Sequence, residues 1–295
     1  MNLGPVRQTK WDIRAVGNWV GGGTGTGAII TAAYLTLSGV DSFNFSLAGI
    51  VLVAGGLFSV ALEIGRPFRS LNVFRNPFTS WMSREAWVAL LVLPLGAAAF
   101  WYHSEQLLVL AALAAGLYLY CQARILRASR GVPAWRVPQI MPLIISTGLI
   151  EGSGLVLLAG IINSPVSYLA AIPLFLVVVL ILLGVRMLAW RGYYNALKNN
   201  APEGTVAALR RIRLPFFLLG DLVPMLLILT ALLTGSLVTV LDVIALVLMV
   251  LAGWLLKFII VTRAGFFQGY AMVHTPARGA GTPGPGTKPG WVLKR

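Results

Sequence analysis

The chain has very few of the side chains from which proteins build redox and metal centres. Its 295 residues include one cysteine, Cys121, and two histidines, His103 and His274. One cysteine excludes an internal disulfide, and a cysteine-ligated iron–sulfur cluster or structural zinc site needs several thiolates. Because neither histidine lies in an apolar segment, we predict no haem b between transmembrane helices and no metal site.

Charged side chains are also scarce. They make up 11% of the chain and hydrophobic residues 58%, whereas a soluble domain has roughly 25% charged and about 45–50% apolar residues. This apolar surplus cannot be buried in one soluble core and predicts an all-α integral membrane protein. The 23 basic residues outnumber the 9 acidic ones, but they lie between apolar runs. The charge therefore indicates membrane topology, and we expect no nucleic-acid partner.

Eight apolar segments approach the roughly 20 residues that a bilayer span requires. They cover residues 16–38, 43–64, 85–102, 106–123, 140–162, 166–185, 214–235 and 237–261. We assign all Lys and Arg residues to the termini and to the connections after the second, fourth and sixth segments. Arg186 is placed just after the sixth segment, and Lys257 near enough to the end of the eighth to snorkel.

This charge distribution predicts the topology, because positively charged loops stay in the cytoplasm. Both termini are expected on the cytoplasmic side, which agrees with an even number of spans. We predict an eight-helix membrane domain over residues 1–272 and a Gly- and Pro-rich extended tail over 273–295.

A run of glycines opens the first segment, between Asn18-Trp19 and Gly27. Small residues in a membrane helix allow another backbone to approach closely. The run is interpreted either as a helix-packing surface or as a notch that faces a flat ligand.

Several acidic residues lie where membrane proteins rarely have them. Glu63 and Glu85 bracket an arginine-rich connection that also contains Trp81, while Glu151 and Asp221 lie inside apolar segments. Carboxylates at such depth usually have partners or a function. We expect either structural ion pairs, with nearby arginines such as Arg84 as partners of Glu63 and Glu85, or a polar rim around a ligand that exchanges protons.

Two segments resemble a known family of membrane proteins. The residues GRPFRSLN at 65–72, with SWMSRE at 80–85, and RASRGVPAWR at 127–136 resemble cytoplasmic loops of the membrane-anchor subunits of DMSO-reductase-type molybdoenzymes. Eight spans match the broader family of polysulfide and nitrite reductase anchors. A narrower resemblance, to the anchor of phenylacetyl-CoA:acceptor oxidoreductase, rests on residues 8–19, the glycine run and residues 257–271.

The resemblance implies a complex in the cytoplasmic membrane of a bacterium or archaeon. A molybdopterin catalytic subunit and a ferredoxin-like iron–sulfur subunit would dock on the cytoplasmic face, and this chain would exchange electrons with ubiquinone or menaquinone. The family's acidic residue after the loop corresponds to Glu85, and a position that is often histidine is Glu63 here. We assign proton exchange to Glu85 and Glu63, and quinone binding to Asn18, Trp19, Arg66 and Trp81.

Two other functions remain open from the sequence. One is an ion- or solute-translocating subunit in which Glu151 and Asp221 line the path, and the other is a purely structural anchor without quinone chemistry. Glu151 and Asp221 are also second candidates for a proton path deeper in the membrane.

Overall fold

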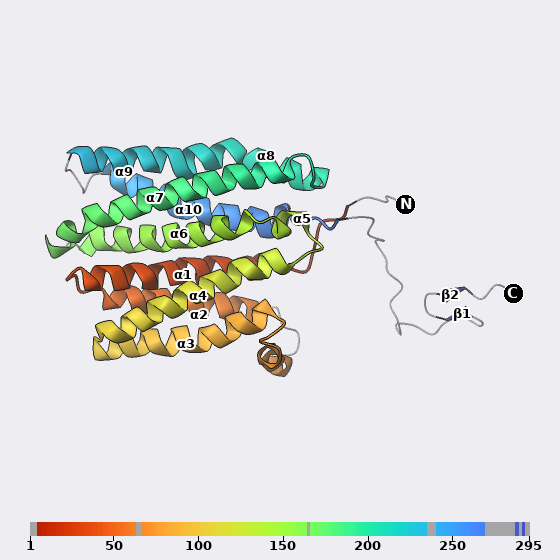
Figure 1. Ribbon diagram of the computed structural model, residues 1–295, viewed down its shortest axis with the longest axis horizontal. Helices are drawn as coiled ribbons and strands as arrows, with labels where there is room; N and C mark the ends of the chain where they lie inside the picture. The colour runs from red at the N-terminus through yellow and green to blue at the C-terminus, as the bar shows by residue number, and fades with distance from the viewer. Residues whose placement is uncertain are drawn as a thin grey trace.

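A computed structural model of the protein describes residues 5–62, 67–163, 166–234, 240–268, 287–288 and 291–292. Long helices lie side by side and form one all-α bundle (Figure 1). The α-helices, with 3-10 and π segments labelled η, are α1 (Ile13–Leu37), α2 (Phe43–Ala61), η1 (Pro67–Arg75), α3 (Trp81–Tyr102), α4 (Glu105–Ala128), α5 (Pro133–Arg136), α6 (Ile140–Asn163), α7 (Val166–Leu197), α8 (Glu203–Pro215), η2 (Phe216–Leu222), α9 (Val223–Thr234), α10 (Val240–Phe258) and η3 (Ile259–Arg263).

Seven helical units in the described ranges are long and apolar enough to cross a membrane. The chain is therefore a multi-pass membrane protein with seven candidate spans. The 25-residue helix α1 has the necessary length, but its glycines and threonines lower its hydropathy below that of the other seven. It corresponds to the first of the eight predicted segments.

Helix α1 lies in the middle of the bundle and packs against α2, α4 and α6 (Figure 1). Its glycines make this position possible. A Cβ atom on Gly25 would collide with the carbonyl oxygen of Gly49 in α2, and one on Gly27 would collide with the backbone of Gly148 and Gly152 in α6. The helix-packing interpretation of the glycine run is thus confirmed.

Several helices extend beyond the apolar segments that predicted them. Helix α7 continues to Leu197, twelve residues past the predicted end at 185, and α4 continues to Ala128. The segment predicted at 214–235 is the second part of one helical unit, Glu203–Thr234. Hydropathy locates the apolar centre of such helices. It does not locate their ends, because the helix continues through residues that are less apolar. The predicted turn at 235–237 involves residues outside the described ranges.

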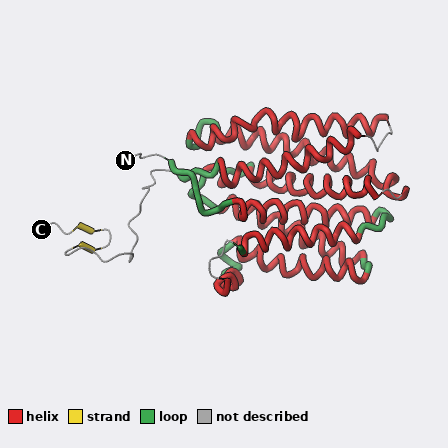
Figure 2. The backbone as a smooth tube through the Cα atoms, turned by 180° about the vertical axis from the view of Figure 1, so that it is seen from behind, coloured by secondary structure: helices red, strands yellow, loops and turns green. Residues whose placement is uncertain are grey.

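The two ends of the bundle-forming chain meet. Arg7 pairs with Phe266 in an isolated antiparallel bridge, and the amide of Gln8 donates to the carbonyl of Gly265 at 2.7 Å. The start of α1 and the end of η3 therefore lie at the same end of the bundle, as Figure 2 also shows. In the tail, only the two-residue strands β1 (Thr287–Lys288) and β2 (Trp291–Val292) are described, and they pair antiparallel.

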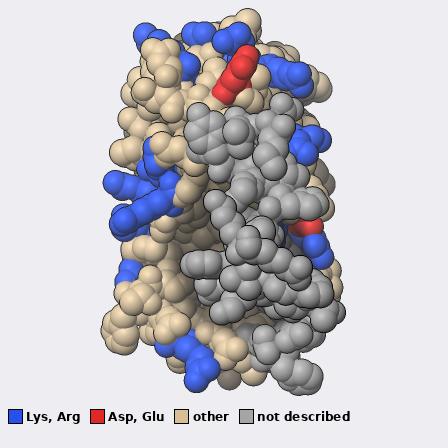
Figure 3. Space-filling model, turned by 90° about the vertical axis from the view of Figure 1, so that its right-hand side faces the viewer, with Lys and Arg blue, Asp and Glu red and all other residues tan. Residues whose placement is uncertain are grey.

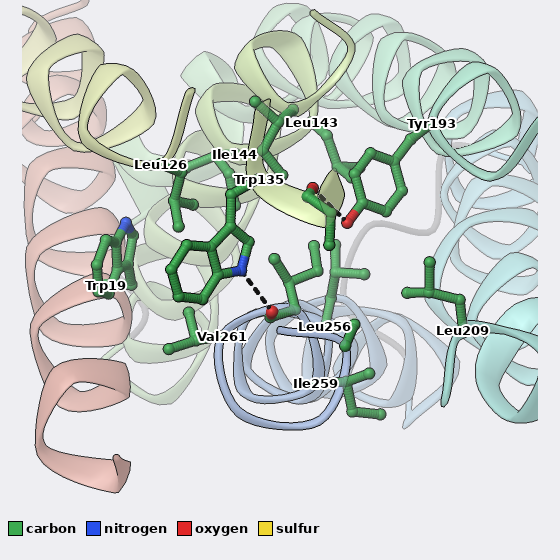
Figure 4. Packing of buried hydrophobic residues seen from close by; sticks show 14 of the residues in the cluster. Trp19, Leu126, Trp135, Leu143, Ile144, Tyr193, Leu209, Leu256, Ile259 and Val261 are labelled. Atoms are coloured by element: carbon green, nitrogen blue, oxygen red, sulfur yellow. Dashed lines mark hydrogen bonds between the residues drawn. The ribbon is translucent and has the colours of Figure 1, made fainter. Parts of the chain in front are cut away.

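A buried aromatic core closes this end of the bundle (Figure 4). The indole nitrogen of Trp135 donates to the carbonyl of Ile260 at 2.8 Å, and the Tyr193 hydroxyl donates to the carbonyl of Ala134 at 2.9 Å. These bonds tie the short helix α5 to η3 and α7. Helix α5 belongs to a predicted connection, so these two hydrogen bonds hold part of that connection against the end of the bundle.

Candidate functional site

Glu85 is buried one turn from the start of α3, with 7% of its surface exposed. The side-chain amide of Asn18 donates to its carboxylate at 3.2 Å. The side-chain oxygen of Asn18 in turn accepts from the Tyr118 hydroxyl at 3.3 Å, and the backbone carbonyl of Asn18 accepts from the side-chain amide of Gln122 at 2.9 Å. We call Asn18, Glu85, Tyr118 and Gln122 the Glu85 group. It joins α1, α3 and α4 without an opposite charge.

The glycine run of α1 also makes room for this group. A Cβ atom on Gly22 would overlap the amide nitrogen of Gln122 and come close to the Tyr118 ring. The polar side chains of α4 can therefore reach the backbone of α1, and the missing side chain at position 22 serves hydrogen bonding as well as packing.

The expected pairing of Arg84 with Glu85 is wrong. The Arg84 guanidinium donates to the carbonyls of Pro77 and Phe78, both at 2.7 Å, and lies over the Trp81 ring. Consecutive residues of an α-helix point about 100° apart. Glu85 therefore faces the interior while Arg84 turns back along the helix start.

The two tryptophans predicted to bind a cofactor have different immediate neighbours, although Trp81 packs at the edge of the buried cluster that contains Trp19. Trp81 lies one helical turn before Glu85, between the guanidinium groups of Arg84 at 4.1 Å and Arg124 at 4.5 Å. Trp19 belongs instead to the aromatic core, where its ring centroid lies 4.9 Å from that of Trp11. The buried indole nitrogen of Trp19 has no hydrogen-bond partner among the described residues.

The other two predicted site residues, Glu63 and Arg66, lie outside the described residues. Of the six, the structure therefore brings Asn18 and Glu85 into contact. It places Trp81 one turn before Glu85 on α3 and Trp19 in the buried cluster against which Trp81 packs.

An open hollow beside Trp81 carries a concentrated positive charge. It has a volume of about 590 Å³ and is lined by Thr79, Trp81 and the arginines at positions 124, 127, 130 and 136. We call it the arginine hollow. Figure 3 views this end of the bundle and shows Lys and Arg side chains in groups around the edge of the end face.

A buried ion pair joins α6 and α10 on the other side of α1. The Lys257 ammonium donates to the Glu151 carboxylate at 2.6 Å, and neither side chain is exposed. The same carboxylate oxygen accepts from the Thr24 hydroxyl at 2.8 Å. The predicted snorkelling of Lys257 is therefore wrong. Because Gly23 has no side chain, the ammonium can lie against α1 and reach its buried counter-charge.

A second buried ion pair joins α7 to the π segment η2. Arg186 donates to the Asp221 carboxylate at 2.7 Å, with both side chains fully buried. It also donates to the carbonyls of Gly220 and Met249. The placement of Arg186 in a cytoplasmic connection is thus wrong, because α7 continues past it. The other Asp221 oxygen has no partner among the described residues, and π segments often mark functional positions in helices.

Sequence reasoning missed Tyr118, Gln122, Arg186 and Lys257 as interior residues. A signal existed for each pair. Tyr118 and Gln122 are four residues apart and share one helix face. Apolar residues continue on both sides of Arg186 and Lys257, so each charge interrupts an apolar stretch and does not end it.

The described residues contain no group of three His, Cys, Asp or Glu side chains that could hold a metal ion. No family model matches the chain, and no curated protein matches it.

Proposed function

We propose that the protein is the membrane-anchor and quinone-reactive subunit of a molybdopterin oxidoreductase complex. The observation that carries the proposal is the Glu85 group, a buried carboxylate hydrogen-bonded to an amide one turn beneath an arginine-rich end of the bundle. The resemblance of the connections at 65–85 and 127–136 to those of molybdoenzyme anchors supports it.

The proposal includes eight spans, which are the seven candidate spans and helix α1. A helix with many glycines can cross a bilayer when protein surrounds it, and most residues of α1 are buried by α2, α4 and α6. Both termini would then face the cytoplasm of a bacterium or archaeon. Apart from Arg186, Lys257 and the tail residue Lys288, the described Lys and Arg residues lie near helix ends or in the connections that the proposal places on the cytoplasmic side, which supports this orientation through the positive-inside rule.

Quinone reduction consumes two electrons and two protons, so a site for it needs hydrogen-bond donors and a proton-exchanging group. The described residues fit these needs. Asn18 and Tyr118 are donors beside Glu85, and the Trp19 indole nitrogen is a buried donor that has no partner in the part of the chain that the structure describes. Glu85 would exchange protons with the solvent at the arginine-rich end. Glu63 and Arg66 keep their predicted roles as part of the proposal.

The partners follow from the same proposal. A ferredoxin-like iron–sulfur subunit would dock on the arginine-rich end and bring electrons from the molybdopterin subunit to ubiquinone or menaquinone. This chain would carry no haem. Interfaces of this kind are steered by complementary charge, so the docking surface of the partner would be acidic.

The substitution Glu85→Gln tests the proposal, because glutamine keeps the shape of glutamate but cannot exchange a proton. In the purified complex we expect quinone-linked turnover to fall at least tenfold, while turnover of the catalytic subunit with an artificial dye is unchanged. Glu105→Gln, at an exposed position of α4, is the matched control. Equal loss of both activities would assign Glu85 to assembly, and full retention of both would leave a purely structural anchor.

The two buried ion pairs favour a second candidate, an ion-translocating subunit. Charged groups buried in transmembrane helices commonly mark ion or proton paths. Arg186 also donates to the carbonyl of Met249 in α10, the helix that carries Lys257, so both ion pairs are attached to α10. In proteoliposomes with an internal pH dye, Asp221→Asn would abolish proton movement if this candidate is right. A complex that reduces quinone without moving protons would exclude it.

A further inference from the structure

We infer that the arginine hollow binds the phosphate head group of an anionic phospholipid whose acyl chains lie along α4. The hollow lies at the arginine-rich end and shares Trp81 with the proposed quinone site, but the inference does not depend on the proposed function, because its ligand takes no part in redox chemistry.

The charge of the hollow is the first argument. Arg124, Arg127, Arg130 and Arg136 line it, and no described carboxylate forms a salt bridge with any of them. The Nε atom of Arg124 is buried and has no hydrogen-bond partner among the described residues. Four guanidinium groups that share one hollow repel one another unless an anion lies between them. Phosphate oxygens match the forked geometry of guanidinium donors.

The surface of α4 is the second argument. Leu113, Leu117 and Tyr120 are exposed and follow the three- and four-residue spacing of one helix face. The same spacing continues to Arg124 and Arg127. One face of α4 thus changes from apolar to cationic where the hollow begins. An amphiphile with apolar chains and an anionic head matches this order of surfaces.

The aromatic side chains at the boundary complete the site. Tyr120 lies edge-on to Trp81 with 5.7 Å between the ring centroids, and the Arg124 guanidinium lies over the same Trp81 ring. Trp and Tyr are enriched where lipid head groups meet acyl chains. Their position places the phosphate level of the bilayer at the hollow.

These features distinguish an anionic phospholipid from two other ligands. A quinone head group is neutral and would leave four arginines without an anion. A soluble phosphate would use the hollow but would gain nothing from the apolar face of α4. Basic pockets of this kind at the cytoplasmic boundary of transmembrane helices commonly bind anionic head groups.

The test uses the full chain purified in detergent and stripped of lipid, with binding measured by native mass spectrometry. The added lipids are dioleoyl phosphatidylglycerol, its dihexanoyl analogue and dioleoyl phosphatidylcholine, and inorganic phosphate serves as competitor. The double substitution Arg124→Gln and Arg127→Gln removes two charges from the hollow. Arg210→Gln with Arg211→Gln is the matched control, because it removes two exposed charges from α8 at the same end of the bundle.

We expect the hollow variant to bind dioleoyl phosphatidylglycerol about 30-fold more weakly, from roughly 1 kcal/mol per arginine, while the control binds it like the unmodified chain. In the unmodified chain, the dihexanoyl lipid and phosphatidylcholine should bind more weakly than dioleoyl phosphatidylglycerol. Equal weakening in both variants would overturn the site. Inorganic phosphate that displaces the lipid at equal concentration, or phosphatidylcholine that binds as tightly, would overturn the assignment of an anionic phospholipid.

Discussion

Buried carboxylates on the two sides of helix α1 have different kinds of partner. Toward α3 and α4, Glu85 is hydrogen-bonded to a neutral amide from Asn18. Toward α6 and α10, Glu151 is paired with the Lys257 ammonium, and Asp221 is paired with Arg186 one helix further away. The glycines of α1 allow both arrangements, because Gly22 leaves room for Gln122 and Gly23 leaves room for Lys257.

This difference separates two kinds of buried acid. An ion pair holds its carboxylate charged, because protonation of the carboxylate would leave a buried cation without a partner. A carboxylate among neutral donors can gain a proton without creating such a charge. The Glu85 side is therefore suited to proton exchange, and the ion-pair side to holding α6, α7 and α10 together.

Removing a cation from the ion-pair side should have the largest effect. Arg186→Met leaves the Asp221 carboxylate buried and releases two backbone carbonyls. We expect the free energy of unfolding to fall by about 3–5 kcal/mol, measured by denaturant titration in mixed micelles. Arg191→Met, exposed on the same helix, should change it little. A double variant with Asp221→Leu should recover part of the loss, and no recovery would contradict the ion-pair explanation.

The same substitution on the two sides of α1 should give different results. Glu151→Gln leaves the buried Lys257 ammonium without an anion and should cost about 3 kcal/mol. Glu85→Gln keeps a hydrogen-bonding side chain against Asn18 and should cost about 1 kcal/mol or less. Thermal unfolding of both variants, measured side by side in one detergent, checks the difference. Equal losses would remove the distinction between the two sides.

The close approach of α1 to α6 predicts a smaller effect. Gly27→Ala would press a methyl group into the backbone of Gly148 and Gly152, and we expect a loss of about 1–3 kcal/mol. Gly116→Ala, in α4 where no described atom apart from the adjacent backbone of α4 lies within 4 Å of the added carbon, should instead stabilise the chain by roughly 0.5–1 kcal/mol. Unfolding titrations of the two variants distinguish packing from helix propensity, since both add the same methyl group.

The start of α1, which serves both sides, should show the smallest effect. Hydrogen bonds from the side chain and the backbone amide of Arg14 lower the pKa of Asp12 below its usual range. A lowered pKa stabilises the folded state above the unfolded pKa of about 4, and this contribution is lost as the pH falls through the lower folded value. The protection of amides at the start of α1, taken relative to their intrinsic exchange rates at each pH, should therefore fall in acid. Asp12→Asn should remove this pH dependence, and an unchanged profile would contradict it.

The main features of the fold follow from residue patterns that need no tertiary information. Apolar runs located the centres of the helices, because lipid requires about 20 apolar residues per span. The glycine run of the first segment indicated a closely packed helix, since small side chains permit backbone contact. Helices α4 and α7 extend past the predicted apolar segments, because polar residues at a helix end give no hydropathy signal.

The candidate site was only partly accessible from the sequence. Asn18 and Glu85 are predicted to belong to one head-group site, and in the structure the Asn18 amide donates to the Glu85 carboxylate at 3.2 Å, although the two residues are 67 positions apart in the chain. Tyr118 and Gln122 resemble ordinary helix residues until α4 is placed against α1. Arg186 and Lys257 were assigned to the membrane boundary because the rule for loop charges does not distinguish a loop arginine from one buried beside an acid.

By itself, the sequence determined that the chain belongs in a membrane, that it is helical and that its basic residues concentrate at helix ends, because these properties depend on composition and local order. Only the tertiary structure decided which acids meet a cation and which meet an amide. That choice depends on which helices face α1 and on where a glycine leaves space for a neighbouring side chain. Both depend on contacts between residues far apart in the chain.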